Sequence, residues 1–327
     1  MKLNCLNPAL TGDSLITAIQ ESKQKRNPIA EGFIYEHTRT MLTADPGLGK
    51  STISTQMAIE LAAGLPLFGH FRVPQPVKVF YAQTERPLIE ILERIDEIGK
   101  IYPIIKENLA ITGETQKLDL LKPMHVEILI EYIKKSCPGV RICFFDPIYA
   151  LVSGGLSSDI PASLFTRAMS RIQSELNATF WYTHHTTKPQ HSSNGEVIFK
   201  TDPFYGSQWL KAHVTGSLHL KATDTGVSLE RKKDNYRLLP NYVKLDYDQE
   251  TGLCSINSKD IPSIEKIRNY INAMGAAEKE FCFNDIEAAT QLCSRTIREA
   301  LLHNTISDLL IVVNTIRRKK IYKKKPS

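Results

Sequence analysis

A glycine-rich turn near the start of the chain limits the possible folds more than any other segment. It reads Ala44-Asp45-Pro46-Gly47-Leu48-Gly49-Lys50-Ser51. The apolar run before it, Thr40 to Thr43, predicts a strand, and residues 52–64 predict an amphipathic helix. A strand, a glycine-rich turn, Gly-Lys-Ser and a helix in this order are the context of a Walker A motif. The turn therefore predicts an α/β fold that binds a nucleoside triphosphate, although such a turn can also arise by chance.

Phosphate binding by such a turn depends on its backbone, whose N–H groups converge on phosphate oxygens with help from the helix dipole. Lys50 is expected to reach the β- and γ-phosphates of ATP, and the Ser51 hydroxyl to ligate Mg²⁺. The usual motif starts with Gly where this chain has Ala44; because Ala is the smallest substitute, we expect phosphate binding to persist. The predicted nucleotide contacts are Asp45, Pro46, Gly47, Leu48, Gly49, Lys50, Ser51 and Thr52.

Composition narrows the class of protein. A chain of 327 residues with 42% hydrophobic and 23% charged residues is ordinary for a soluble globular protein. No apolar run is long enough to cross a membrane, so no membrane partner is expected. The six cysteines form no CxxC pair and match no zinc spacing, which favours reduced thiols of a cytoplasmic protein. The net charge of +6 points toward nucleic acid without proving it.

Two acidic residues follow predicted strands within residues 33–256, where alternating strand and helix signals predict a largely parallel sheet. Glu85 follows the strand Val77 to Ala82, and Asp146 follows Val140 to Phe145. Strands of a parallel sheet end at the same edge, so both carboxylates are expected near the Walker A turn. Asp146 fits a Walker B residue in the Mg²⁺ shell. Glu85 is a candidate for polarising the attacking water, with an acid at a helix N-terminus as the alternative.

A third polar strand end and a long loop follow. His184 comes directly after the predicted strand Thr179 to Thr183 and is a candidate for hydrogen bonding to the γ-phosphate. Neighbours on an extended chain point to opposite faces, so we do not expect His184 and His185 to share a metal ion. Lys188 and Lys200, with the aromatic residues of the loop, suit phosphate contacts and base stacking. An ordinary surface loop is the alternative.

A basic cluster lies between two later predicted strands. It consists of Arg231, Lys232, Lys233 and Arg237. One of these cations could reach the γ-phosphate bound by a neighbouring subunit, as an arginine finger does. A solvated charged turn is the more common interpretation of such a cluster.

Together these motifs resemble the RecA-like ATPases of the AAA_25 group, and within it the RepA-type hexameric replicative helicases. The resemblance covers about residues 30–255. It depends on the Walker A turn and on Tyr-Ala-Gln-Thr-Glu at 81–85, Phe-Phe-Asp-Pro at 144–147, His-His-Thr-Thr-Lys at 184–188 and Gly-Ser-Gln-Trp-Leu-Lys at 206–211. It implies the roles already given to Lys50, Ser51, Glu85 and Asp146, and a γ-phosphate sensor at His184. It also implies a ring, usually of six subunits, with ATP at the subunit interfaces and loops facing a central channel.

One departure from the resemblance concerns the trans-acting cation. RepA-like proteins can carry an arginine finger in the helix that here begins at Gly206-Ser207, but residues 211–215 contain no Arg. Lys232 or Lys233 is therefore the expected trans-acting cation, by analogy with RecA-type lysines, and Arg231 or Arg237 is a further candidate.

Residues 262–327 predict a separate winged-helix-like domain, after an N-terminal helical arm and linker at 1–32 and a RecA-like ATPase core at 33–258. Helices are expected over residues 262–274, 284–290 and 294–303, and a hairpin over 309–315 and 320–323. Arg295 and Arg298 share one face of the third helix. The domain holds 12 Lys and Arg against 7 Asp and Glu, so salt-dependent binding to DNA is expected, with protein contact as the alternative. The further candidate DNA contacts are Arg317, Arg318, Lys319 and Lys320.

The sequence thus favours an oligomeric ATP- and Mg²⁺-dependent motor on single- or double-stranded DNA, of the RepA-like replicative helicase type and belonging to a mobile element. The alternative is an ATP-dependent DNA-binding adaptor or regulator that does not unwind DNA processively. A nucleotide-sensing scaffold that binds proteins rather than DNA is a third hypothesis.

Overall fold

The structure is a computed structural model in which the chain forms two compact units, Met1–Ile256 and Asn257–Ser327. The structure describes residues 11–15, 27–85, 87–99, 107–113, 118–185, 190–191, 197–198, 207–256, 266–267, 270–271, 274, 280–290, 292, 294–302, 310–316 and 319–324.

A nine-stranded sheet forms the centre of the first unit, with the order β13-β12-β11-β10-β3-β7-β6-β4-β5. The pairings from β10 to β5 are parallel, and those from β10 to β13 are antiparallel. The predicted largely parallel sheet is therefore confirmed, with an antiparallel extension at one side. The strands are β3 (Arg39–Ala44), β4 (Val79–Gln83), β5 (Leu109–Thr112), β6 (Ile142–Asp146), β7 (Thr179–His185), β10 (Gly216–Ala222), β11 (Gly226–Asp234), β12 (Tyr242–Tyr247) and β13 (Cys254–Ser255).

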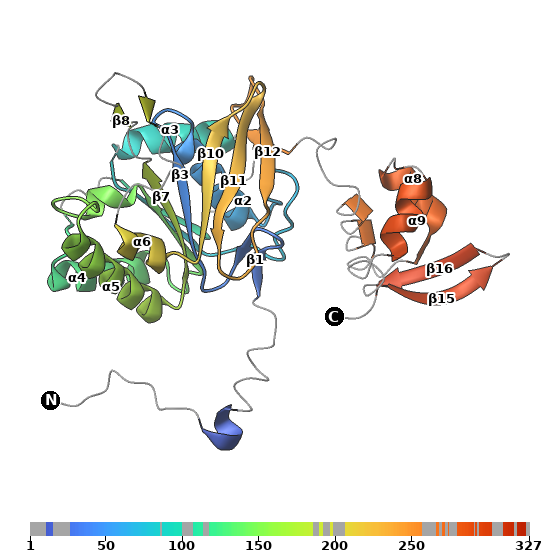
Figure 1. The fold of residues 1–327 in the computed structure, drawn as a ribbon, viewed down its shortest axis with the longest axis horizontal. Coiled ribbons are helices and arrows are strands. Elements are labelled where there is room, and N and C mark those ends of the chain that lie inside the picture. The colour runs from blue at the N-terminus through green and yellow to red at the C-terminus, as the bar shows by residue number, and fades with distance from the viewer. Residues whose placement is uncertain are drawn as a thin grey trace. The chain divides into compact units, whose positions relative to one another are not determined.

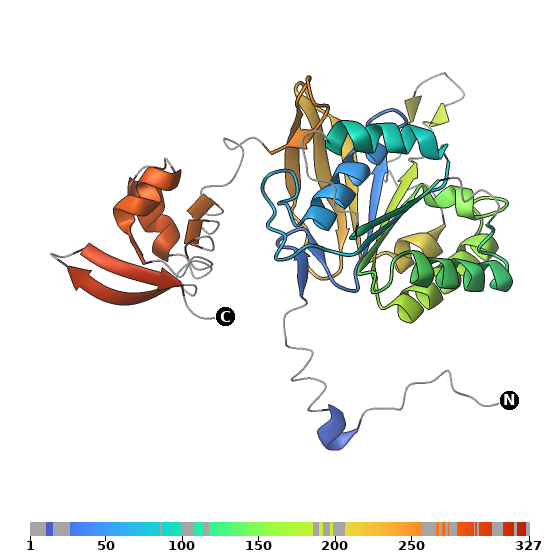
Figure 2. The same ribbon diagram turned by 180° about the vertical axis from the view of Figure 1, so that it is seen from behind.

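Helices cover both faces of this sheet (Figures 1 and 2). One face carries α2 (Lys50–Ala63) and α3 (Leu88–Gly99). The other carries α4 (Pro123–Ser136), α5 (Asp159–Leu176) and α6 (Gln208–His213). A short 3₁₀ helix, η1 (Ile148–Leu151), follows β6 directly. Within the described segments, no helix combines the length and the apolar character needed to cross a bilayer.

Alternation along the central strands gives each face its own core, because successive side chains of a strand point to opposite faces. Leu42 of β3, Phe144 of β6 and Trp181 of β7 pack with α2. Met41, Phe145 and Phe180 lie one residue away and pack with α4 and α5. This assignment of faces fixes where the side chains at the strand ends point.

A polar cluster anchors α6 to the sheet at the start of β3. The buried His213 ring is 3.2 Å from the Arg39 guanidinium through Nδ1 and 3.1 Å from the Tyr182 hydroxyl through Nε2. Burial, and then the charges of Arg39 and Lys233, lower the pKa of His213 to about 3. The ring is therefore neutral at physiological pH, and it serves as a hydrogen-bonding link rather than a charge.

Two small antiparallel pairs complete the first unit. They are β1 (Pro28–Ala30) with β2 (Ile34–Tyr35), and β8 (Gln190–His191) with β9 (Val197–Ile198). Phe33, between β1 and β2, stacks on Trp181 with ring centroids 5.9 Å apart. The N-terminal arm expected over residues 1–32 is described only at 11–15 and from residue 27 onward.

The second unit contains β14 (Phe281–Cys282), α8 (Phe283–Thr290), α9 (Ser294–Leu302), β15 (Leu310–Ile316) and β16 (Lys319–Lys324). Its sheet has the order β14-β16-β15, with both pairings antiparallel. Apolar side chains from the helical residues 267 and 271, from β14 and from both helices form its core. The described positions 266–267, 270–271 and 274 are helical, and the rest of the helix expected over 262–274 lies outside the described residues.

Candidate nucleotide site

The Walker A turn lies between β3 and α2 at the carboxyl edge of the parallel strands. Gly47 and Gly49 have positive φ angles of 83° and 86°, which favour glycine. A Cβ at Gly49 would also lie 2.4 Å from the hydroxyl oxygen of Tyr247 on β12. The backbone conformation therefore favours glycine at position 49, and a Cβ there would also have to displace the Tyr247 hydroxyl.

Lys50 is folded into this turn, with its side chain largely buried. Its Nζ donates hydrogen bonds to the carbonyl of Ala44 at 2.8 Å and to that of Asp45 at 3.2 Å. Burial lowers the pKa of the Lys50 ammonium, while the charges of Asp146, Asp45 and Glu85 oppose this shift. The ammonium thus lies on the loop that would hold the phosphates, close to two candidate carboxylates.

Asp146, the last residue of β6, is held by donors from two neighbouring strands. The Tyr81 hydroxyl on β4 donates to Oδ2 at 2.5 Å, and the Thr183 hydroxyl on β7 donates to Oδ1. Asp146 is only 1% exposed, and a buried carboxylate needs such partners. Burial and the Asp146 charge raise the pKa of Tyr81 well above its usual value, so the phenol keeps its proton. The carboxylate is therefore held in one orientation from both sides.

Glu85 follows β4 and is exposed at the same edge of the sheet. The hydroxyl of Tyr149, in η1, donates to its Oε1 at 2.6 Å. Burial and then Glu85 itself raise the pKa of Tyr149. The backbone N–H of Glu85 donates to Gln83 Oε1 at 3.1 Å. Lys50, Asp146 and Glu85, which lie far apart in the sequence, are thus brought to one edge.

The two histidines at the end of β7 point to opposite faces, and the structure places His185, not the predicted His184, on the side of Asp146. Trp181 and Thr183 face α2 and Asp146, so alternation places His185 on that side and the fully buried His184 on the other. His185 is the histidine near the charges of Lys50, Glu85 and Asp146. Its Nδ1 is buried and has no hydrogen-bond partner among the described residues. An orphaned ring nitrogen here suits a bound phosphate.

The donors at this edge fit Mg²⁺. Ser51 offers a hydroxyl and Asp146 a carboxylate, and oxygen ligands are those that Mg²⁺ prefers. Both Asp146 oxygens already accept hydrogen bonds, so contact through water is the suitable mode. Among the described residues, no cluster of three His, Cys, Asp or Glu side chains could hold a metal by itself. A magnesium ion at Ser51 and Asp146 would therefore share its ligands with the nucleotide and water.

The candidate trans-acting cations lie toward the opposite edge of the sheet. Gly216, at the start of β10, pairs with both Thr40 and Asp234, so the turn after β11 lies at the amino ends of the parallel strands. Arg231 binds Asp234 and the carbonyl of Leu239 there.

The other three cations differ in their partners. Lys233 Nζ donates to the Lys211 carbonyl in the last turn of α6 at 2.6 Å, and Lys232 pairs with Glu230 at 2.9 Å. Arg237 is exposed, with a positive φ of 57°. Three of the four candidates, Arg231, Lys232 and Lys233, thus have partners in their own subunit, and a role in a neighbouring site stays a prediction.

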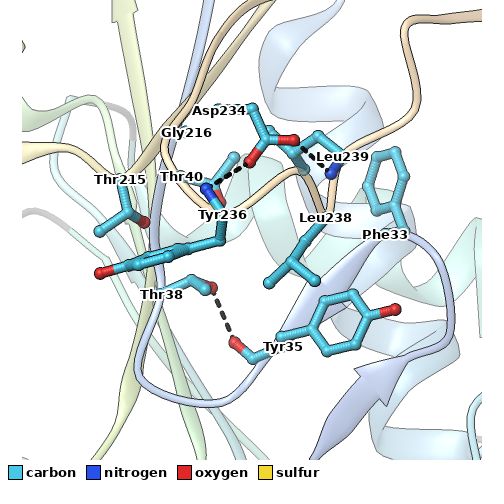
Figure 3. Close-up of a pocket in the computed structure, with 10 residues that line it drawn as sticks. All are labelled: Phe33, Tyr35, Thr38, Thr40, Thr215, Gly216, Asp234, Tyr236, Leu238 and Leu239. Atoms are coloured by element: carbon cyan, nitrogen blue, oxygen red, sulfur yellow. Dashed lines mark hydrogen bonds between the residues drawn. The ribbon is translucent and has the colours of Figure 1, made fainter. Parts of the chain in front are cut away.

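A hollow of about 230 Å³, counting space open to solvent, lies at this opposite edge (Figure 3). The Asp234 carboxylate beside it accepts from the backbone N–H groups of Tyr236 and Leu239 at 3.1 and 2.8 Å. The Thr38 hydroxyl donates to the carbonyl of Tyr35 at 2.7 Å. These bonds stabilise the two turns beside the hollow, one after Asp234 and one from Tyr35 to Thr38. The hollow is separate from the Walker A edge.

The predicted DNA contacts are only partly described. Lys188, Lys200, Arg317 and Arg318 lie outside the described residues. Lys319 and Lys320 belong to β16, and Arg295 and Arg298 to α9. The Arg298 guanidinium lies 5.8 Å from the centre of the Phe283 ring, and Arg295 is exposed.

Sequence reasoning missed four residues that the structure brings to the site: Tyr81, Tyr149, Thr183 and His185. Strand alternation was the available signal for two of them, because Thr183 and His185 are two and four residues from Trp181 in a strand whose odd positions face α2. Pairing with a carboxylate across strands has no comparable signal in the sequence.

Comparison with known proteins gives one family. A family model described as AAA domain, AAA_25, matches residues 7–191, more than half of the 327 residues. No curated protein matches the chain. With the Walker A turn and the carboxylates at one edge of a mostly parallel sheet, this match shows that the chain belongs to the AAA_25 family and carries a P-loop ATPase domain of the AAA/RecA-like type.

Proposed function

We propose that the chain is an oligomeric Mg²⁺- and ATP-dependent motor on DNA, of the RepA-like replicative helicase type, working in the replication of a mobile element. The observation that carries the ATPase part is the convergence of Lys50, Asp146 and Glu85 at the carboxyl edge of the sheet. A phosphate loop, a Mg²⁺-shell carboxylate and a second, exposed carboxylate are the groups that hydrolysis of ATP by water requires.

Each residue has a separate task in this proposal. Lys50 and the backbone N–H groups of the turn bind the phosphates and offset their charge. Glu85 accepts a hydrogen bond from the attacking water and orients it, since its carboxylate is exposed at the edge. Burial and then the Lys50 charge lower the pKa of His185, so its ring is neutral and can donate an N–H to a phosphate oxygen. Bound Mg²⁺ would supply further charge neutralisation at Ser51 and Asp146.

The DNA part is supported by the second unit. Helical turns, two helices and a β-hairpin, in this order, match the winged-helix interpretation, and α9 is the helix that would approach DNA. Arg295 is exposed on that helix, while Arg298 lies against Phe283. The basic run from Arg317 to Lys320 contains no acid, and its last two residues begin β16.

The test combines assays of ATP hydrolysis and DNA unwinding with a measurement of the mass of the assembly. We expect ATPase activity that single-stranded DNA stimulates, unwinding of a forked duplex, and a larger assembly with ATP and DNA than without. Lys50→Ala is expected to abolish hydrolysis and unwinding, whereas Lys135→Ala, at an exposed position of α4, retains both. DNA-stimulated hydrolysis without unwinding of any forked substrate would count against the helicase.

One observation favours a second candidate, an ATP-dependent DNA-binding adaptor without processive unwinding. Three candidate trans-acting cations, Arg231, Lys232 and Lys233, are engaged within their own subunit, and residues 211–215 contain no Arg. A ring motor needs a cation from the neighbour at each site. If Lys232→Ala and Arg237→Ala both hydrolyse ATP at the wild-type rate in the assembled state, the adaptor is the better description.

DNA binding by the second unit has its own test. Replacing Arg317, Arg318, Lys319 and Lys320 by Ser is expected to weaken DNA binding and to flatten its dependence on salt. On single-stranded DNA the logarithmic slope should fall by about 0.7 for each phosphate that is no longer neutralised by a cation. The matched control, Arg317→Lys with Arg318→Lys, keeps the charge and the slope. An unchanged slope in the Ser variant would favour the protein-binding scaffold.

A further inference from the structure

Tyr149 links Glu85 to the end of a second strand at the Walker A edge. Its hydroxyl donates to Glu85 Oε1 at 2.6 Å, and its ring lies 5.2 Å from the His185 ring, centroid to centroid. Glu85 follows β4, Tyr149 follows β6, and His185 ends β7. One phenol therefore contacts the ends of two strands from the end of the strand that lies between them.

The turn that carries Tyr149 is itself fixed. The flanking Ile148 and Leu151 side chains are buried in the core, and the Leu151 carbonyl accepts from the N–H of Leu120 at 2.9 Å. Just beyond the turn, the Ser153 hydroxyl donates to Asp119 Oδ2 at 2.7 Å. The phenol is thus presented from an anchored element.

Glu85 lies at a more exposed position than the phenol. It follows the last residue of β4 by two positions. A glutamate has three side-chain torsions, and each contact that it makes narrows the rotamers that it samples. The bond from Tyr149 is one such contact and engages one carboxylate oxygen, and a carboxylate has further lone pairs that can accept a hydrogen bond from water.

We propose that Tyr149 is a positioning residue for hydrolysis, whose hydroxyl fixes the Glu85 carboxylate so that its second oxygen orients the attacking water. This inference rests on the proposed ATPase function and on the role of Glu85 in it. Tyr149 keeps its own proton throughout. It acts only through Glu85 and touches neither the phosphate nor the water.

Tyr149→Phe tests this directly, because it removes the hydroxyl and keeps the ring against His185. Loss of one hydrogen bond to a charged group is expected to lower kcat about tenfold or more, while KM for ATP stays within about twofold. Tyr132→Phe, at an exposed tyrosine of α4, is the matched control.

Two more variants separate this inference from the function on which it rests. Glu85→Gln is expected to abolish hydrolysis, and Tyr149→Phe added to it is expected to cost nothing further, because the phenol acts through that carboxylate. Wild-type kcat in Glu85→Gln would overturn the role of Glu85 and this inference together. Loss of activity in Glu85→Gln, with an unchanged kcat in Tyr149→Phe, would overturn only the role of Tyr149. A raised kcat in Tyr149→Phe would also overturn it, because the hydroxyl would then restrain Glu85 rather than place it.

Discussion

The buried pair of Tyr81 and Asp146 gives a stability prediction that the structure defines closely. The Tyr81 hydroxyl lies 2.5 Å from Asp146 Oδ2 and 3.3 Å from the Thr55 hydroxyl. Its ring stacks on Phe144 with centroids 5.6 Å apart. Tyr81→Phe removes the oxygen and keeps the ring, so the change in unfolding free energy reports the hydrogen bond rather than the packing.

The size of the effect follows from the charge of the acceptor. A hydrogen bond to a charged group contributes about 1.5–3 kcal/mol, and in the variant the side chain of Asp146 keeps, among the described residues, the donor on Thr183. We therefore expect the free energy of unfolding to fall by about 2 kcal/mol. For a unit of this size, that corresponds to a decrease in Tm of about 4–8 °C.

Tryptophan fluorescence in urea is a selective assay for this change. Both tryptophans of the chain, Trp181 and Trp209, belong to the first unit, and Trp181 is buried beside α2. The control is Tyr132→Phe, whose exposed ring packs edge-to-face with Phe80 and which should change stability by less than about 0.5 kcal/mol. Equal urea midpoints for Tyr81→Phe and the wild type would refute the reasoning, as would an equal loss in Tyr132→Phe.

Three further predictions follow from single positions. Gly49→Ala should lower stability by about 1–3 kcal/mol and abolish ATP binding in calorimetry, because of its positive φ and the Tyr247 hydroxyl; binding that persists would contradict this. Burial holds the pKa of His213 at about 3, against about 6.5 when unfolded, so the unfolded chain takes up the proton first. The contribution of His213 to the free energy of unfolding, measured in urea, should be fully present above about pH 6.5. It should fall toward pH 3 by at most about 1.4 kcal/mol per pH unit, and His213→Gln should flatten this slope. His185→Asn should lower kcat by about a hundredfold with little change in Tm, whereas His184→Asn should mainly lower Tm; the reverse pattern would restore His184 as the site residue.

The order of motifs along the chain predicts the carboxyl edge of the sheet well. A Walker A turn followed by strand-terminal acids requires parallel strands, because only then do Lys50, Glu85 and Asp146 meet. The prediction of a largely parallel sheet is confirmed because it depends on local patterns and on a rule that holds for all parallel sheets.

The choice between His184 and His185 shows what a motif leaves open. A motif gives a position along the chain, and at the end of a strand the face changes with every residue. The register of β7 against its neighbours, with Thr183 directed at Asp146, decides which histidine meets the phosphate edge. The alternation was visible from Trp181 onward, but its direction needed the packing of that tryptophan against α2.

The two tyrosines could not be assigned because their bonds join residues 65 and 64 positions apart, across a pairing that the sequence does not specify. Strands β4 and β6 are adjacent, and a tyrosine hydroxyl from each donates a hydrogen bond to the carboxylate at the end of the other. Tyr81 on β4 binds the carboxylate at the end of β6, and Tyr149 after β6 binds the carboxylate after β4. Any shift between these strand ends disturbs both bonds, so the exchange fixes the spacing of the two carboxylates. The Tyr81 bond is buried and the Tyr149 bond is exposed, so loss of the first should appear mainly as stability and loss of the second mainly as rate.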